Sequence, residues 1–207
     1  MPIFFEQEVD KDTRLAVWHI AEEEAFFDVP LQRAITHPHK RLQHLAGRYL
    51  LRHLFPDFPL ALIRIADTRK PFLDDEAFHF SVSHCGDYAA AIASRSLRVG
   101  IDIELVSEKV QRIRHKFLSP VEEQRIAPGA ACWSDPELAT LVWSSKEAVF
   151  KWYGKGNVDF RHDMPVQSVR DTEAGCRFSL LFGKELGQPL DVHCRMTGDL
   201  CLAYVAG

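Results

Sequence analysis

Apolar and polar residues follow two repeats along the chain, one typical of helices and one typical of strands. The helical repeat covers residues 38–55 and 135–153, and Gly154 is expected to end the second helix. A hairpin is expected where two strands are joined through residues 84–87. The alternating repeat predicts strands over residues 14–20, 62–66, 78–83, 88–93, 99–105, 176–182, 190–196 and 200–206.

Two helix starts carry local signals. Ser119-Pro120-Val121-Glu122 is a capping box, in which the serine caps the helix and the glutamate reaches back to the serine amide. Asp135-Pro136-Glu137 is expected to open the longest helix in the same way. Each half of the chain combines helices with antiparallel strands, which predicts an α+β fold of two similar lobes, residues 1–96 and 97–207.

Composition narrows the class of protein. The chain has 207 residues, a formal net charge of −4 and five cysteines. The cysteines form no C-x-x-C pair, which disfavours a disulfide framework or a zinc ribbon and favours a reducing cytoplasm. We expect no membrane partner, because neither a basic leader nor a membrane-length apolar run is present. The mild acidity also disfavours nucleic acid as a partner.

Charge is unevenly distributed along the chain. No acidic residue occurs between Pro30 and Phe55, whereas this stretch carries Arg41 and Arg48 among several basic residues. Such a stretch is either a solvated helix face or a local anion site, and the charge pattern leaves both open.

Two carboxylates share one face of a predicted strand. In Gly100-Ile101-Asp102-Ile103-Glu104 the apolar and acidic side chains alternate, so Asp102 and Glu104 point the same way. Their spacing is too wide for one shared proton and suits two ligands of a hard cation. An ordinary half-exposed strand has the same pattern, so the motif alone leaves both interpretations open.

The helix at 135–153 has a second face opposite its apolar stripe. Trp143, Glu147, Phe150 and Lys151 lie on that face. Large aromatic side chains are costly in water, so we expect the face to pack on the other lobe, a ligand or a partner. Glu147 and Lys151 also have the spacing of an ordinary ion pair along a helix.

A lysine and a histidine flank the first strand of the predicted hairpin. Lys70 stands in Arg69-Lys70-Pro71, and His84 lies at the strand end beside Cys85. Neighbours on a strand point to opposite faces, so Cys85 and His84 are not a nucleophile and its base. His84 is equally consistent with a polar turn cap. The glycine-rich loops of mononucleotide- and dinucleotide-binding proteins are absent from the sequence.

These motifs together resemble those of the 4′-phosphopantetheinyl transferases, specifically the two-lobed monomeric type. The resemblance rests on Gly100-Ile101-Asp102-Ile103-Glu104 and, some forty residues later, on the segment from Trp143 to Lys151. Further matches are Arg69-Lys70-Pro71, Ser81-Val82-Ser83-His84, the segment 117–122 and the basic helix at 41–52.

The resemblance implies two pseudo-symmetric α+β lobes, each an antiparallel sheet packed with helices, with the active site in the cleft between them. Mg²⁺ would be held by Asp102, Glu104 and Glu147, and Mn²⁺ could replace it. A monomer would transfer the phosphopantetheine arm of coenzyme A to a serine of an acyl or peptidyl carrier protein. Adenosine 3′,5′-bisphosphate would be released.

In that reaction Lys151 would neutralise charge on the departing phosphate. Glu147 would take the serine proton, directly or through a water, and Asp102 would act beside it at the metal.

Coenzyme A would lie in the cleft between the two lobes. Lys70, Ser83 and His84 match family positions that contact its nucleotide, and Lys151 would reach its phosphates. Either Arg41 or Arg48 would meet the 3′-phosphate.

Two departures from the family pattern leave the predicted metal ligands untouched. Arg69 stands where glycine is common, and Cys85 stands where a small hydroxyl residue is common. Carrier recognition is expected on basic and apolar surface over residues 117–125. Two other functions stay open, a metal-dependent phosphohydrolase and a catalytically silent module that binds coenzyme A or a carrier. The sequence leaves the carrier and its pathway undetermined.

Overall fold

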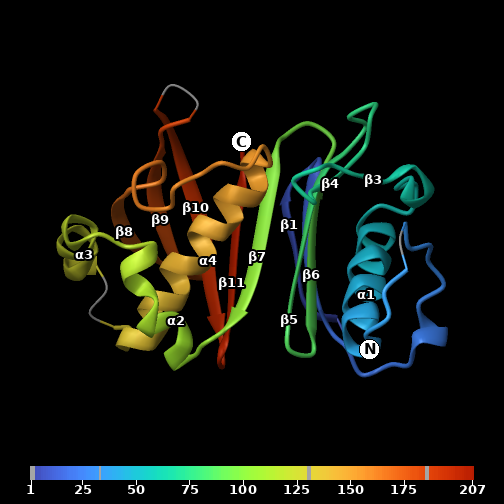
Figure 1. The fold of residues 1–207 in the computed structure, drawn as a ribbon, viewed down its shortest axis with the longest axis horizontal. Helices are drawn as coiled ribbons and strands as arrows, with labels where there is room; N and C mark the ends of the chain where they lie inside the picture. Colours follow the sequence, from blue (N-terminus) through green and yellow to red (C-terminus); the bar gives the residue numbers. More distant parts are fainter. Residues whose placement is uncertain (1–2, 33, 130–131, 185–186) are drawn as a thin grey trace. The chain divides into compact units, whose positions relative to one another are not determined.

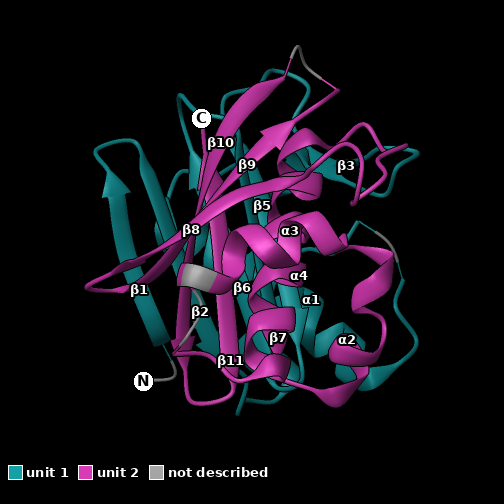
Figure 2. Ribbon diagram, turned by 90° about the vertical axis from the view of Figure 1, so that its left-hand side faces the viewer, with its two compact units in different colours: residues 1–103 teal, residues 104–207 magenta. Residues whose placement is uncertain are grey.

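A computed structural model describes residues 3–32, 34–129, 132–184 and 187–207. The chain forms two compact units, residues 1–103 and 104–207 (Figure 2), and each is described here by itself. Both combine antiparallel strands with a long helix (Figure 1), so the predicted α+β class is confirmed. The division between the units falls inside strand β7, whereas the sequence placed the lobe boundary between residues 96 and 97.

Unit 1 is built on an antiparallel sheet of strand order β1-β2-β6-β5. Helix α1 (Pro38–Leu54) covers one face of this sheet (Figure 1). The small side chains of Ala89, Ala91 and Ala93 face the helix from β6 and belong to the same buried core as its leucines. The strands are β1 (Ile3–Asp10), β2 (Thr13–His19), β5 (His79–Cys85) and β6 (Tyr88–Ser94).

The connection within the β5–β6 hairpin is shorter than predicted. Gly86 and Asp87 alone form it, and Gly86 has φ of 53°. A two-residue turn favours a positive φ, which glycine adopts without strain. His84 and Cys85 therefore lie in β5, where they pair with Ala89 and Tyr88.

The strand predicted over residues 62–66 is largely wrong. Leu60–Leu62 forms a short 3-10 helix, η2, and only β3 (Arg64–Ile65) pairs with β4 (Pro71–Phe72). Leu62 is 60% exposed and Ile65 is 41% exposed, so two apolar residues of the predicted strand lie at the surface. A further short 3-10 helix, η1, spans Glu24–Phe26.

The second sheet has strand order β7-β11-β10-β9-β8. Helix α4 (Asp135–Tyr153) covers one face of the strands of unit 2 (Figure 1). Phe178 and Phe182 of β9 and Val205 of β11 belong to the core that forms there. The strands are β7 (Val99–Leu105), β8 (Val166–Thr172), β9 (Gly175–Phe182), β10 (Gln188–Thr197) and β11 (Leu200–Ala206).

The helix boundaries of unit 2 follow local signals. The capping box at Ser119 is present, and Gly154 ends α4 with φ of 71°, as predicted. Helix α4 begins at Asp135, as predicted, but its cap is Ser134, whose amide and hydroxyl donate hydrogen bonds to the Glu137 carboxylate. The remaining helices are α2 (Glu108–Arg112), η3 (Arg114–Lys116), α3 (Pro120–Ile126) and η4 (Ala127–Gly129).

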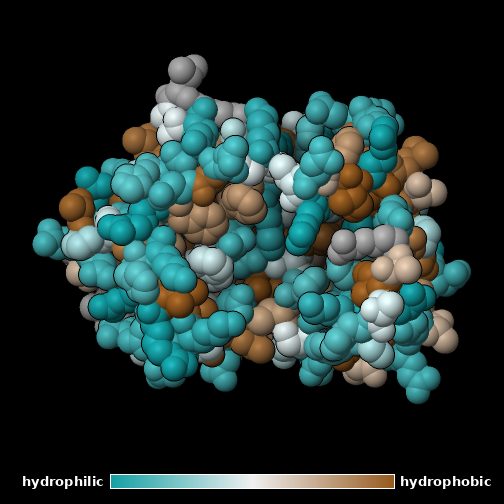
Figure 3. Space-filling model, viewed as in Figure 1, coloured by the Kyte–Doolittle hydropathy of each residue, from teal (hydrophilic) through white to brown (hydrophobic). Residues whose placement is uncertain are grey.

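Polar residues predominate on the face of the units seen in Figure 3, where apolar residues occur in separate small patches. Across the described parts of the chain, we find no helix with both the length and the apolar character needed to cross a bilayer.

Candidate functional site

Asp102 is held in place by two serines of strand β5. The Ser83 hydroxyl donates a hydrogen bond to Asp102 Oδ1 at 2.9 Å. The hydroxyl oxygens of Ser81 and Ser83 accept hydrogen bonds from the backbone amides of Ile101 and Ile103, each at 3.2 Å. Hydroxyl side chains thus connect β7 to β5, at a register that sets Asp102 against Ser83.

Asp102 is only 5% exposed, so the alternative of a half-exposed strand is wrong at this residue. An ionised carboxylate so deeply buried is costly unless hydrogen bonds or a cation compensate it. Ser83 supplies one such hydrogen bond. Carboxylate oxygens are also the ligands that Mg²⁺ prefers, so the chemistry of the predicted Asp102, Glu104 and Glu147 set fits this ion.

Ser83 is 7% exposed, and its hydroxyl contacts Asp102 and the Ile103 amide. These contacts give Ser83 a part in orienting Asp102. Its predicted contact with the coenzyme A nucleotide stays a prediction.

Histidine and lysine side chains lie on neighbouring elements of unit 1. The exposed His84 of β5 packs against His44 of α1, with ring centroids 5.3 Å apart. Gln43 of α1 donates a hydrogen bond to the Gly86 carbonyl at 2.8 Å, which fixes the helix against the hairpin. Burial, and secondly the charge of Arg98, lowers the pKa of Lys70 to about 8.

Arg69, one residue before Lys70, has φ of 67°. This is the left-handed region, where a residue with a Cβ is strained and glycine is not. Residue 69, where the resemblance leads us to expect glycine, therefore has a backbone conformation that favours glycine.

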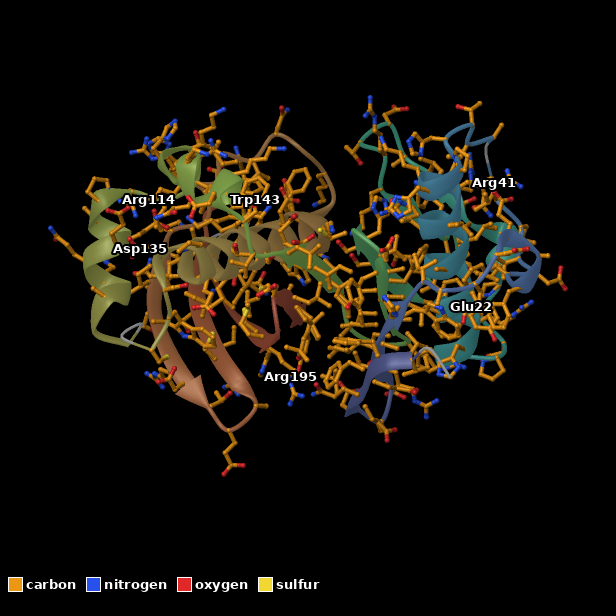
Figure 4. All side chains as sticks on the ribbon, turned by 90° about the horizontal axis from the view of Figure 1, so that it is seen from below. Glu22, Arg41, Arg114, Asp135, Trp143 and Arg195 are labelled. Atoms are coloured by element: carbon orange, nitrogen blue, oxygen red, sulfur yellow. The ribbon has the colours of Figure 1, made fainter. Side chains whose placement is uncertain are left out.

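Arg41 and Arg48 differ sharply in accessibility. The Arg41 side chain is 40% exposed and its Nε lies 2.7 Å from the Glu24 carboxylate. Arg48 is 6% exposed, and its Nε donates to the Gln32 side chain at 3.2 Å. Figure 4 shows Arg41 at the periphery of unit 1, so its guanidinium is the one that an anion in solution can reach.

The predicted carboxylate trio is divided between the units. Asp102 belongs to unit 1, whereas Glu104 on β7 and Glu147 on α4 belong to unit 2. Glu147 and Lys151 are both partly buried and lie one helical turn apart on α4. No group of three His, Cys, Asp or Glu side chains placed to hold a metal occurs among the residues described here. The metal site therefore stays a prediction.

The aromatic side chains on the face of α4 that carries Trp143 and Phe150 pack partly against their own unit, and the expected contact of the face with the other lobe, a ligand or a partner stays a prediction. The Trp143 ring lies 5.2 Å from Phe117 and 5.6 Å from Phe160, between ring centroids. Phe150 lies 5.8 Å from Phe160. Figure 4 shows Trp143 on the side of α4 where Arg114 and η3 lie. Side chains from the segments before α3 and after α4 thus cover these rings in part.

Sequence reasoning missed a buried ion pair beside Glu147. Lys146 is 0% exposed, and its Nζ lies 2.5 Å from Glu122 Oε1. Burial lowers the pKa of Lys146, and the charge of Glu122 opposes that shift. The sequence did contain a signal for it. Lys146 directly follows Ser145, a residue on the apolar stripe of the 135–153 helix that was expected to face the core.

The sequence model of the 4′-phosphopantetheinyl transferase superfamily matches residues 98–205. That range contains the acidic residues of β7 and the Glu147 to Lys151 segment of α4. It also contains the Glu122–Lys146 pair, whereas Lys70, His84 and α1 lie outside it.

Curated relatives match about half of the chain. Enterobactin synthase component D of Salmonella austin is 33% identical over 112 residues, which are 54% of this chain and 47% of that protein. The protein of the same name from Escherichia coli K12 is 32% identical over 116 residues, 54% of either chain. Human L-aminoadipate-semialdehyde dehydrogenase-phosphopantetheinyl transferase is 30% identical over 131 residues, 54% of this chain and 42% of the relative.

The chain thus spans about half the length of the curated relatives it matches. The superfamily match, in contrast, runs through more than half of the chain and includes both predicted acidic motifs. The chain belongs to the 4′-phosphopantetheinyl transferase superfamily.

Proposed function

We propose that this protein transfers the 4′-phosphopantetheine arm of coenzyme A to a serine hydroxyl of an acyl or peptidyl carrier protein. The observation that carries the proposal is the superfamily match over residues 98–205, which includes Asp102, Glu104, Glu147 and Lys151 together. In the reaction the serine oxygen bonds to the phosphorus next to the pantetheine arm. The bond from that phosphorus to the bridging oxygen breaks, and adenosine 3′,5′-bisphosphate leaves.

Asp102, Glu104 and Glu147 are the proposed ligands of Mg²⁺, and Mn²⁺ could replace it. The burial of Asp102 supports this role, because a cation offsets the cost of an ionised carboxylate in a site that excludes water. A bound divalent ion would neutralise charge on the pyrophosphate.

Two residues of α4 have complementary charges for the transfer step. Lys151 would stabilise the negative charge that grows on the departing bisphosphate. Glu147 would accept the proton that the serine hydroxyl loses. Their separation by one helical turn lets both reach the same ligand.

Coenzyme A is proposed to bind the cationic and imidazole groups of unit 1. Lys70 and His84 would contact the nucleotide, and Arg41 would meet the 3′-phosphate. The exposure of the Arg41 side chain supports its choice over the buried Arg48. Ser83 would act in the same region, through the hydrogen bond that orients Asp102.

The carrier is proposed to dock on the basic surface formed by α2, η3 and α3. Exposed basic residues there are Lys109, Arg112, Arg114, His115, Lys116 and Arg125. Val121 of α3 is 55% exposed among them and offers an apolar contact. Phe117 and Leu118 lie in the core and are not part of this surface. An acidic carrier would find complementary charge here.

The setting of the proposed reaction is a monomer in the cytoplasm. All five cysteines are free thiols, which suits a reducing compartment.

Bisphosphate release tests the reaction type. The chain is incubated with coenzyme A and Mg²⁺, with and without apo carriers, and adenosine 3′,5′-bisphosphate is quantified by chromatography. A transferase releases it only when a carrier is present. Release at the same rate without a carrier would indicate a phosphohydrolase, and tight coenzyme A binding without release would indicate a silent module.

The variant Glu147→Gln should abolish release. Its matched control is Glu173→Gln, which neutralises an exposed carboxylate in the β8–β9 turn of the same unit. Wild-type release by Glu147→Gln would remove this residue from the proposed site.

A further inference from the structure

The buried Glu122–Lys146 ion pair joins α3, which carries part of the proposed docking surface, to α4, which carries the proposed proton acceptor. Glu122 follows Val121, which is exposed on the proposed docking surface of α3. Lys146 precedes Glu147, the proposed proton acceptor on α4. The Glu122 and Lys146 side chains are 1% and 0% exposed, so the pair is shielded from solvent.

The three N–H groups of the Lys146 ammonium have three acceptors. They are Glu122 Oε1 at 2.5 Å, the Phe117 carbonyl at 2.6 Å and the Phe160 carbonyl at 2.8 Å. Phe117 and Phe160 also contact the ring of Trp143 on α4. One lysine therefore connects α4 to the segment before α3 and to the loop after α4.

Both oxygens of the Glu122 carboxylate accept further hydrogen bonds. Its Oε1 also accepts the Val166 amide of β8 at 2.9 Å. Its Oε2 accepts the amide and the hydroxyl of Ser119 at 2.8 and 2.7 Å, which closes the capping box of α3. A single carboxylate thus caps α3 and joins it to both β8 and α4.

A gain in folding stability does not by itself explain why an ion pair is buried here. Buried ion pairs are often no more stabilising than apolar side chains of similar volume, because removing both charges from water is costly. Their hydrogen bonds, in contrast, are directional and favour particular arrangements of the elements that they connect. The Glu122–Lys146 pair connects α3 to α4 through such a bond.

We propose that Glu122 and Lys146 are positioning residues, which fix the exposed face of α3 relative to Glu147 so that a carrier docked on α3 presents its serine at the reacting distance. This inference rests on the proposed function. Displacement of a reacting group by about 1 Å can lower a rate by roughly a hundredfold. Loss of the pair should therefore lower kcat more than it weakens coenzyme A binding.

Two variants and one control separate positioning from stability. Lys146→Met breaks the pair and leaves Glu122 buried without its cation. The double variant Lys146→Met/Glu122→Gln removes both charges and should recover much of the lost stability. Leu141→Ala is the control, because Leu141 is 0% exposed on the same helix and its truncation destabilises the core while the pair stays intact.

Transfer kinetics and amide hydrogen exchange are measured for each protein well below its unfolding temperature. We expect both pair variants to lower kcat at least tenfold with KM for coenzyme A within twofold of wild type. In Lys146→Met, α3 and residues 147–151 should lose exchange protection together. Leu141→Ala should keep wild-type kcat and protected α3.

Three results would overturn the positioning role. The first is recovery of kcat in the double variant together with its stability. The second is a kcat in Leu141→Ala as low as in Lys146→Met at equal loss of stability. The third is unchanged protection of α3 in Lys146→Met. Absence of transfer by the wild-type chain would instead overturn the proposed function, and it is recognised before any variant is compared.

Discussion

Lys70 is expected to destabilise the fold in which it stands. It immediately precedes β4, is partly buried, and its pKa falls from 10.5 to about 8 because burial, and then Arg98, disfavours the charged form. Methionine has a side chain of similar length without the charge. We therefore expect Lys70→Met to raise the free energy of unfolding at pH 7.

The size of this effect follows from the pKa difference. A fall from 10.5 to about 8 corresponds to about 3 kcal/mol, at about 1.4 kcal/mol per pKa unit. Because the pKa is lower in the folded state, the unfolded chain binds more protons between about pH 8 and 10.5. The wild-type free energy of unfolding should thus rise with pH across that window. Below about pH 8, the folded state carries the full destabilisation from the buried charge of Lys70. Lys70→Met should gain up to about 3 kcal/mol at pH 7, or roughly 5–10 °C in Tm.

Urea unfolding followed by circular dichroism at pH 7 and pH 9.5 measures this difference. Lys116→Met is the matched control, because Lys116 is exposed and surface changes shift stability by only about 0.5 kcal/mol or less. The same Lys70→Met protein should bind coenzyme A more weakly in calorimetry. A Lys70→Met protein that is less stable than wild type at pH 7 would refute the argument from burial.

Three further predictions concern local features. Arg69→Gly should gain about 0.5–1 kcal/mol in urea unfolding, since glycine relieves the left-handed φ at some cost in chain entropy, and a loss of stability would contradict this. Glu24→Gln should lower KM for coenzyme A by about twofold to fivefold, because it releases Arg41 from an exposed ion pair worth about 0.4–1 kcal/mol; an unchanged KM would argue against Arg41 as the phosphate contact. Burial raises the pKa of the Cys194 thiol, so thiol titration of the folded protein should leave three cysteines unreacted until urea is added, and their early reaction would show that the sheet opens. The three are Cys176, Cys194 and Cys201.

The features that the sequence predicted well are those with local causes. Helix α1 has its stripe and its starting proline within a few turns, and α4 has a glycine at its end. The β5–β6 hairpin has its turn glycine in place. Each signal lies within a few residues of its effect, so no knowledge of tertiary contacts was needed.

The missed elements depend on their neighbours in the sheet. Strand β1 lies at a sheet edge, and its residues are alternately exposed and only partly buried, so its apolar pattern is weak. Strand β8 is also at an edge and ends in three exposed residues. The sequence pattern alone does not define these strands; β1 is fixed by its hydrogen bonds to β2, and β8 by its hydrogen bonds to β9.

In the candidate site, too, local motifs could be predicted from the sequence, whereas features that depend on tertiary contacts could not. The acidic positions of β7 and α4 were visible as motifs, but the burial of Asp102 was not, because alternation alone is identical in half-exposed strands. The partner of Lys146 lies 24 residues away on another helix, at Glu122. Glu122 looked fully explained by its capping box, and only the three-dimensional structure shows that its carboxylate also accepts a hydrogen bond from Lys146 of α4.

Intact-mass spectrometry of apo carriers tests the central claim most directly. A panel of acyl and peptidyl carriers is incubated with the wild-type chain, coenzyme A and Mg²⁺, and in parallel with Asp102→Asn and with the control Glu173→Gln. We predict that at least one carrier gains the mass of one phosphopantetheine group with wild type and with Glu173→Gln, and none with Asp102→Asn. Unchanged mass for every carrier with the wild-type chain, or full modification by Asp102→Asn, would contradict the account.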